Sequence, residues 1–143
     1  MNNGDDRKRS GKTVLTYGTF DLFHIGHLRL LERLAKLGDR LVVGVSTDEF
    51  NALKGKKSLI PFEDRAAIVG ALGMVDEVFA EDRWDQKEED IRRFRADILG
   101  MGSDWEGKFD ELGELCEVVY LERTEGLSST SIRGQLIPRH HEP

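Results

Sequence analysis

Short apolar runs alternate with amphipathic stretches along this chain of 143 residues. Five runs predict β-strands, at residues 12–17, 40–46, 76–80, 97–101 and 117–121, because they are short, largely apolar and bounded by polar residues or glycine. Between the first two, leucines spaced by three or four positions predict an amphipathic helix over 25–37. Further helices are predicted over about 61–72, 86–94 and 128–136, and the polar, glycine-broken stretch 51–59 predicts a mobile loop.

This alternation predicts an α/β protein with a single-domain, Rossmann-like, three-layer fold built on a five-stranded parallel sheet. The continuous apolar run RLVVGVS is typical of a strand that is buried on both faces. We expect one domain over residues 13–137, a disordered tail over 1–12 and a frayed tail over 138–143.

In such sheets, ligands bind beyond the carboxyl ends of the strands, where the strand order reverses. Polar segments follow four of the five predicted strands, at residues 18–27, 48–57, 101–105 and 123–130. These four segments are therefore expected to meet at one rim of the sheet.

The first of them contains two histidines, in the order His24-Ile25-Gly26-His27. If a helix begins near Ile25, its first amides are unpaired, and both imidazoles can donate hydrogen bonds to phosphoryl oxygens. Two other readings stay open, ordinary surface histidines or part of a metal site with Asp21 as a further ligand. The residue types favour a cradle for an anion.

Lysines cluster in the second segment, at Lys54, Lys56 and Lys57. Such a run is usually just solvated, but at this rim it could close over a triphosphate as a lid. Arg65, one turn into the next predicted helix, could contact an anion or pair with Glu63 or Asp64.

The last segment, RTEGLSST, places an arginine at the end of a strand and hydroxyl residues at the start of a helix. Helix capping explains one hydroxyl but not the whole cluster, which can donate to phosphates. Two helix starts would then face one nucleotide site, although the chain has neither a P-loop nor the glycine pattern for dinucleotides.

Composition excludes several classes. The net charge of −6 argues against nucleic-acid binding, which needs clustered positive charge. No apolar run approaches the roughly 20 residues of a membrane span, so no membrane insertion is expected. The single cysteine forbids an intrachain disulfide and favours a cytoplasmic location.

GTFDLFHIGH, the loop lysines, MGSDWEGKFD and RTEGLSST together resemble the bacterial glycerol-3-phosphate cytidylyltransferases, within the HxGH nucleotidyltransferase superfamily. The resemblance runs from about residue 13 to residue 132, which makes 13–137 a nucleotidyltransferase domain. HxGH alone marks only the superfamily, whereas the last two motifs point to cytidylyltransferases. An adenylyltransferase, a different phospho-alcohol or sugar phosphate as acceptor, and an inactive nucleotide-binding module stay open as alternatives.

The resemblance implies that CTP and sn-glycerol 3-phosphate react by in-line attack on the α-phosphorus, giving CDP-glycerol for teichoic acid synthesis and pyrophosphate. It also implies a homodimer and Mg²⁺ bound mainly through the nucleotide phosphates, with no protein ligand assigned. The family pattern has an arginine where this sequence has Gly73.

The resemblance further implies roles for individual residues. The implied catalytic residues are His24, His27, Lys54, Lys56 and Arg123. Those implied to bind the nucleotide are Tyr17, Gly18, Thr19, Phe20, Asp21, His24, His27, Gly102, Asp104, Trp105, Arg123, Thr124, Ser128 and Ser129. Those implied to bind the acceptor are Asp21, Lys54, Lys56 and Arg65.

Overall fold

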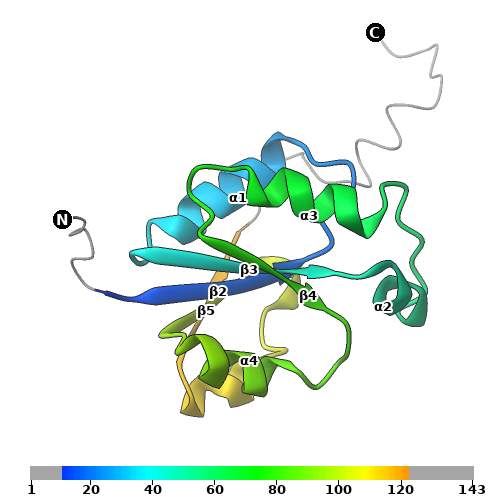
Figure 1. Cartoon of the computed structure of the whole chain (residues 1–143). Helices are drawn as coiled ribbons and strands as arrows, with labels where there is room; N and C mark the ends of the chain where they lie inside the picture. Colours follow the sequence, from blue (N-terminus) through cyan, green and yellow to red (C-terminus); the bar gives the residue numbers. More distant parts are fainter. Residues whose placement is uncertain (1–10, 123–143) are drawn as a thin grey trace, which may run out of the picture.

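The computed structural model describes residues 11–122 (Figure 1). Both predicted tails, the predicted helix over 128–136 and the RTEGLSST motif lie outside these residues, except for the described part of the N-terminal tail at 11–12.

A five-stranded parallel sheet forms the centre of the structure, with the strand order β4-β3-β2-β5-β6. The strands are β2 (Thr13–Gly18), β3 (Arg40–Ser46), β4 (Glu77–Glu81), β5 (Ile98–Gly102) and β6 (Glu117–Leu121). The predicted fold class is confirmed, and each predicted strand lies within one residue of the observed bounds.

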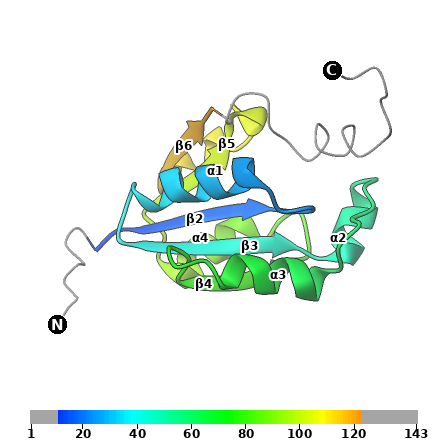
Figure 2. The ribbon, with the colours of Figure 1, turned by 90° about the horizontal axis from the view of Figure 1, so that it is seen from above.

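Helices cover both faces of the sheet, and successive strand residues point to opposite faces. On one face, α1 (Ile25–Ala35) and α3 (Phe62–Gly70) pack against a cluster that includes Val14 (Figures 1 and 2). On the other face, α4 (Lys87–Phe94) packs against a cluster that includes Leu15. Both side chains are fully buried. The prediction that RLVVGVS is buried on both faces is confirmed, because every residue of β3 after Arg40 is buried.

The leucines of the first helix face the sheet, as their spacing predicts. Leu31 and Leu34 of α1 are fully buried against the sheet. Gly100 of β5 lies directly beneath Leu34, where a Cβ atom would collide with the leucine side chain. This glycine therefore lets the Leu34 side chain of α1 lie close to the sheet.

A short helix, α2 (Asp48–Leu53), lies where a mobile loop was predicted from residue 51, so the start of that prediction is wrong. Thr47 caps the helix, since its Oγ1 accepts a hydrogen bond from the N–H of Phe50 at 3.0 Å. Phe50 and Asn51 are almost fully buried. A helix of six residues with one buried aromatic side chain gives too little periodicity to be recognised in the sequence.

Two 3₁₀ helices, η1 (Ser103–Trp105) and η2 (Asp110–Glu114), lie between β5 and β6, and η1 lies within the polar segment 101–105. Among residues 11–122, no helix is long and apolar enough to cross a membrane.

The strand order places a crevice at the carboxyl ends of β2 and β5. The chain runs from β2 outward to β3 and β4, and then returns to β5 on the other side of β2. This reversal is the switch point at which α/β sheets bind their ligands.

Candidate active site

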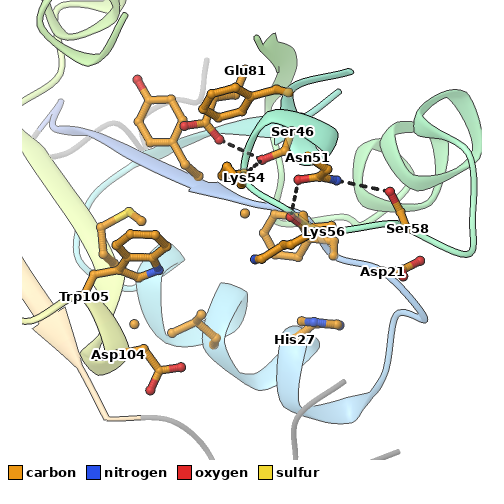
Figure 3. Close-up of a pocket in the computed structure, with 18 of the residues that line it drawn as sticks. Asp21, His27, Ser46, Asn51, Lys54, Lys56, Ser58, Glu81, Asp104 and Trp105 are labelled. Carbon is orange, nitrogen blue, oxygen red and sulfur yellow. Dashed lines mark hydrogen bonds between the residues drawn. The ribbon is translucent and has the colours of Figure 1, made fainter. Parts of the chain in front are cut away.

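A cavity of about 650 Å³ opens at this switch point (Figure 3). Segments after β2, β3, β4 and β5 line it, so three of the four polar segments meet there as predicted. The predicted site residues that line it are Tyr17, Gly18, Thr19, Phe20, Asp21, His24, His27, Lys54, Lys56, Gly102, Asp104 and Trp105. Arg123, Thr124, Ser128 and Ser129 lie outside the described residues.

The two histidines are held by the backbone at the start of α1. His24 is the N-cap residue, and its Nδ1 accepts a hydrogen bond from the N–H of Gly26 at 3.0 Å. Nδ1 of His27 accepts one from the N–H of His24 at 3.2 Å. Because an accepting nitrogen carries no proton, each neutral ring carries its proton on Nε2.

This arrangement changes the predicted anion cradle in one respect. The amides of His24 and Gly26 donate to imidazoles and are therefore already used. The Nε2–H groups take their place as donors. Nε2 of His24 is buried, and among residues 11–122 it has no hydrogen-bond partner. A buried donor without an acceptor is rare and costly, which favours a ligand oxygen at this position.

Burial favours the neutral form of both imidazoles. Burial lowers the pKa of His24. Burial also lowers the pKa of His27 to about 4, with a smaller lowering effect from His24 and an opposing one from Asp21. Within the described part of the chain, no three side chains of histidine, cysteine or acidic residues gather to hold a metal ion, so the metal-site reading gains no further ligand there.

Aromatic rings fix the orientation of His27. Phe20 and Phe23 lie against its imidazole, with ring centroids 5.5 and 5.2 Å away. Phe20 adopts a left-handed backbone conformation, with φ of 55°, which is uncommon for a residue other than glycine. The turn between β2 and α1 thus holds a strained residue beside His27.

Asp21 anchors the lysine loop. Its two carboxylate oxygens accept hydrogen bonds from the N–H groups of Leu59 and Ile60, at 2.9 and 3.0 Å. A second connection begins at Thr19, whose hydroxyl donates a hydrogen bond to the side-chain oxygen of Asn51. The side-chain NH₂ group of Asn51 in turn donates to the hydroxyl of Ser58 at 3.1 Å. The loop over 54–60 is therefore joined to the end of β2 at two places, and Asp21 orients backbone donors.

Lysines form the cationic wall of the cavity. Nζ of Lys54 donates to Oγ of Ser46 at 3.3 Å and lies 4.5 Å from the centre of the Phe50 ring. Lys56 and Lys57 line the cavity from the loop that follows α2. The sequence analysis missed Lys87, which is 8% exposed at the first position of α4. The rule for strand ends could have found it, because it follows β4.

Arg65 lies elsewhere, and its predicted contact with the acceptor is not supported by this geometry. It does not line the cavity and is 1% exposed. Its guanidinium donates to the carbonyl groups of Ile60, Thr19 and Ser46 and to the carboxylate of Asp48, at 2.6 to 2.8 Å. The predicted alternative, a pair with an acidic neighbour in its own helix, is wrong as well. Arg65 joins the ends of β2 and β3 to the loop.

The opposite side of the cavity is aromatic. Trp105 stacks on Phe109 with ring centroids 5.5 Å apart, and Trp105 and Asp104 lie across the cavity from His27 in Figure 3. The ring of Tyr17 lies beneath Lys87, and its hydroxyl donates to Asp90 at 2.7 Å. Gly102 ends β5 between these groups. A flat aromatic wall across the cavity from the histidine donors suits a nucleotide, with its base on one side and its phosphates on the other.

Position 73 lies near the amino ends of the strands, at the end of the sheet opposite the cavity. Three residues later, the N–H of Asp76 donates to the carbonyl of Leu41 at 2.9 Å, and Leu41 lies at the amino end of β3. A side chain at Gly73 would meet nothing within 4 Å. An arginine at this position would begin near the amino ends of the strands, whereas the cavity lies at their carboxyl ends.

Comparisons with known proteins agree with this geometry. The cytidylyltransferase-like family profile matches residues 15–135. Glycerol-3-phosphate cytidylyltransferase of Bacillus subtilis (strain 168) is 54% identical over 125 residues, which are 87% of this chain and 97% of that protein. The enzyme of the same name from Staphylococcus aureus (strain NCTC 8325 / PS 47) is 50% identical, over 87% of this chain and 95% of that protein.

A solved structure shows the same fold. The lipopolysaccharide core biosynthesis protein from Thermoplasma volcanium GSS1 superimposes with a TM-score of 0.68 and 26% identity, over 80% of this chain and 98% of that one. The match of the family profile and the identity over nearly the full length of two enzymes lead to one conclusion. The chain belongs to the cytidylyltransferase-like family, and within it to the glycerol-3-phosphate cytidylyltransferases.

Proposed function

We propose that this protein transfers the cytidylyl group of CTP to the phosphate of sn-glycerol 3-phosphate. A phosphate oxygen of the acceptor attacks the α-phosphorus in line, the bond from that phosphorus to the bridging oxygen breaks, and CDP-glycerol and pyrophosphate result. The observation that carries this proposal is the identity of 54% and 50% to two glycerol-3-phosphate cytidylyltransferases over nearly their full length.

The histidines act as fixed hydrogen-bond donors. The Nε2–H groups of His24 and His27 donate to phosphate oxygens on which negative charge builds as the leaving group departs. Neutral donors are sufficient, because the acceptor phosphate is already a nucleophile near neutral pH and needs no general base. Their fixed tautomers mean that no reorientation is needed during the reaction, which lowers the barrier.

The lysines neutralise the phosphates. Lys54, Lys56 and Lys87 come from the loop after α2 and from α4, and all three line the cavity. They bring two polyanionic substrates together in a protein whose net charge is −6. Arg123, Thr124, Ser128 and Ser129 would add contacts to CTP from the motif that follows β6.

Mg²⁺ would enter as part of the CTP complex. Mg²⁺ usually keeps several waters and binds phosphates together with few protein ligands. Both carboxylate oxygens of Asp21 already accept backbone hydrogen bonds, so Asp21 suits loop anchoring better than metal binding. The ion supplies charge neutralisation on the triphosphate. The proposal also includes a cytoplasmic homodimer whose product serves teichoic acid synthesis.

The direct test is pyrophosphate release over a grid of the four nucleotides and a panel of phosphorylated acceptors. We expect turnover with CTP and sn-glycerol 3-phosphate, and CDP-glycerol as the product by mass spectrometry. Faster turnover with another acceptor would identify that compound as the acceptor substrate in place of sn-glycerol 3-phosphate. CTP binding that raises the melting temperature without turnover on any acceptor would indicate an inactive nucleotide-binding module.

A further inference from the structure

A buried carboxylate connects two of the cavity lysines. Glu81, which is 4% exposed, accepts a hydrogen bond from Nζ of Lys87 at 2.9 Å through one oxygen. Its other oxygen accepts one from Oγ of Ser46 at 2.8 Å, and Ser46 in turn accepts one from Nζ of Lys54 at 3.3 Å. Figure 3 shows the part of this chain that joins Glu81, Ser46 and Lys54.

The sheet itself sets the position of this chain. Ser46 and Glu81 are paired residues at the ends of β3 and β4. Lys54 follows β3 as the C-cap of α2, and Lys87 follows β4 as the first residue of α4. Two lysines from different elements are thus connected by hydrogen bonds to one pair of residues at the ends of neighbouring strands.

The energetics of lysine side chains explain why a carboxylate such as Glu81 lies beside the cavity lysines. Lysines are almost never buried without a partner, and a lysine side chain has several rotatable bonds whose freedom is lost when it binds a phosphate. A partner that fixes both ammonium groups in advance lowers that cost. Because one carboxylate serves two ammonium groups, the cluster keeps a net positive charge for a phosphate.

We propose that Glu81 is a positioning residue for the transfer reaction, holding Lys87 directly and Lys54 through Ser46 so that both face the substrate phosphates. This inference rests on the proposed function. Glu81 itself contacts lysines and serine, and it acts on the reaction only through them.

The effect of Glu81 on the pKa of Lys54 supports the same role. Burial lowers its pKa, and the carboxylate of Glu81 acts in the opposite direction. The cations that face it, Lys56, Lys87 and Arg65, lower it further. Glu81 therefore also helps to keep Lys54 protonated at the pH at which the enzyme works.

The test compares Glu81→Gln with Glu77→Gln. Glutamine keeps the shape and an acceptor for Ser46 but removes the charge, so we expect kcat/KM for glycerol 3-phosphate to fall about tenfold or more. The alkaline limb of the pH profile should move to lower pH, because Lys54 loses its proton more easily. Glu77, on the same strand, pairs at the surface with Arg40 at 2.7 Å, and its variant should stay within about twofold of the unmodified protein.

A double-mutant cycle with Lys87→Met separates positioning from folding. If Glu81 acts through the lysines, Glu81→Gln should cost much less in the Lys87→Met background than in the unmodified protein. Additive losses, or a Glu81→Gln variant with an unmoved pH profile and activity within about twofold, would overturn the proposal.

Failure of the proposed function would look different. In that case the unmodified protein would show no cytidylyl transfer. The positioning proposal would then be judged in the ligand-free protein by nuclear magnetic resonance of Nζ of Lys54. We expect the pKa of Lys54 to fall in Glu81→Gln, because the carboxylate that raises it is lost. An unchanged pKa would contradict the role of Glu81.

Discussion

The backbone N–H of His24 donates a hydrogen bond to Nδ1 of His27, three residues later, and the two imidazole rings lie 4.0 Å apart. His27 thus does two things with two nitrogen atoms. Nδ1 helps to close the start of α1, and Nε2–H is the N–H donor of the ring. Substitutions that keep one nitrogen and lose the other can separate these tasks.

Asparagine at position 27 should separate them. Its side-chain oxygen can still accept the hydrogen bond of His24, whereas no donor reaches the place of Nε2. We expect His27→Asn to lose about 100-fold or more in kcat, the usual cost of one lost donor to developing charge. Chemical denaturation should show a free energy of unfolding within about 1–2 kcal/mol of the unmodified protein. Activity within about tenfold of the unmodified protein would contradict the role of His27 as donor.

The lowered pKa of His27 predicts a loss of stability in acid. The folded protein binds a proton at this residue only near pH 4, whereas the unfolded chain binds one near pH 6.5. The unfolded state therefore holds more protons between these values, so stability should fall as the pH drops through this window, by up to about 3 kcal/mol. Urea denaturation between pH 7.5 and pH 4.5 measures this loss. The His27→Asn variant should show a smaller loss, and equal losses in both proteins would assign the effect to other groups.

Arg65→Lys should destabilise the fold. A lysine ammonium cannot serve four acceptors that the planar guanidinium reaches, so we expect a loss of about 3 kcal/mol and a melting temperature lower by about 10 °C. The matched control is Arg29→Lys, an exposed residue that pairs with Glu32, where the change should be about 1 °C or less. A large rise in KM for glycerol 3-phosphate with an unchanged melting temperature would restore the predicted contact with the acceptor.

Asp21→Asn should loosen the lysine loop. The asparagine amide places a donor against one of the two backbone N–H groups that the carboxylate now accepts. We expect faster hydrogen exchange at Leu59 and Ile60 and a fall in kcat of about tenfold, because the lysines lose their fixed places. Asp85→Asn, a change at an exposed carboxylate, is the control and should alter neither quantity. Unchanged exchange at both amides would show that Asp21 does not anchor the loop.

Local patterns predicted most of the fold. The five strands and α1 follow from apolar runs and from the spacing of leucines, which depend on near neighbours in the sequence. The histidine pair could be found for the same reason, because its residues lie three positions apart in one helical turn. Where a short helix buries a single aromatic residue, as Phe50 does in α2, the same patterns fail.

The contacts of the site depend on what the sheet brings together, and these escaped the sequence. Arg65 stands beside two acidic residues in its own helix, yet its acceptors come from the ends of other elements. Glu81 and Lys87 look like ordinary surface charges until the register of β3 and β4 places Ser46 next to Glu81. Such partners follow from strand order and register, and a single sequence contains no local signal for either.

The fixed proton positions on the two imidazoles also have a consequence for the rate in heavy water. Each ring can donate only from Nε2, because Nδ1 accepts a hydrogen bond from the backbone, and in the proposed reaction neither ring takes up or passes on a proton. The bonds that change join phosphorus to oxygen. The chemical step should therefore proceed at nearly the same speed in D₂O as in H₂O, which is what is expected of an enzyme that works by placing charge and not by moving hydrogen.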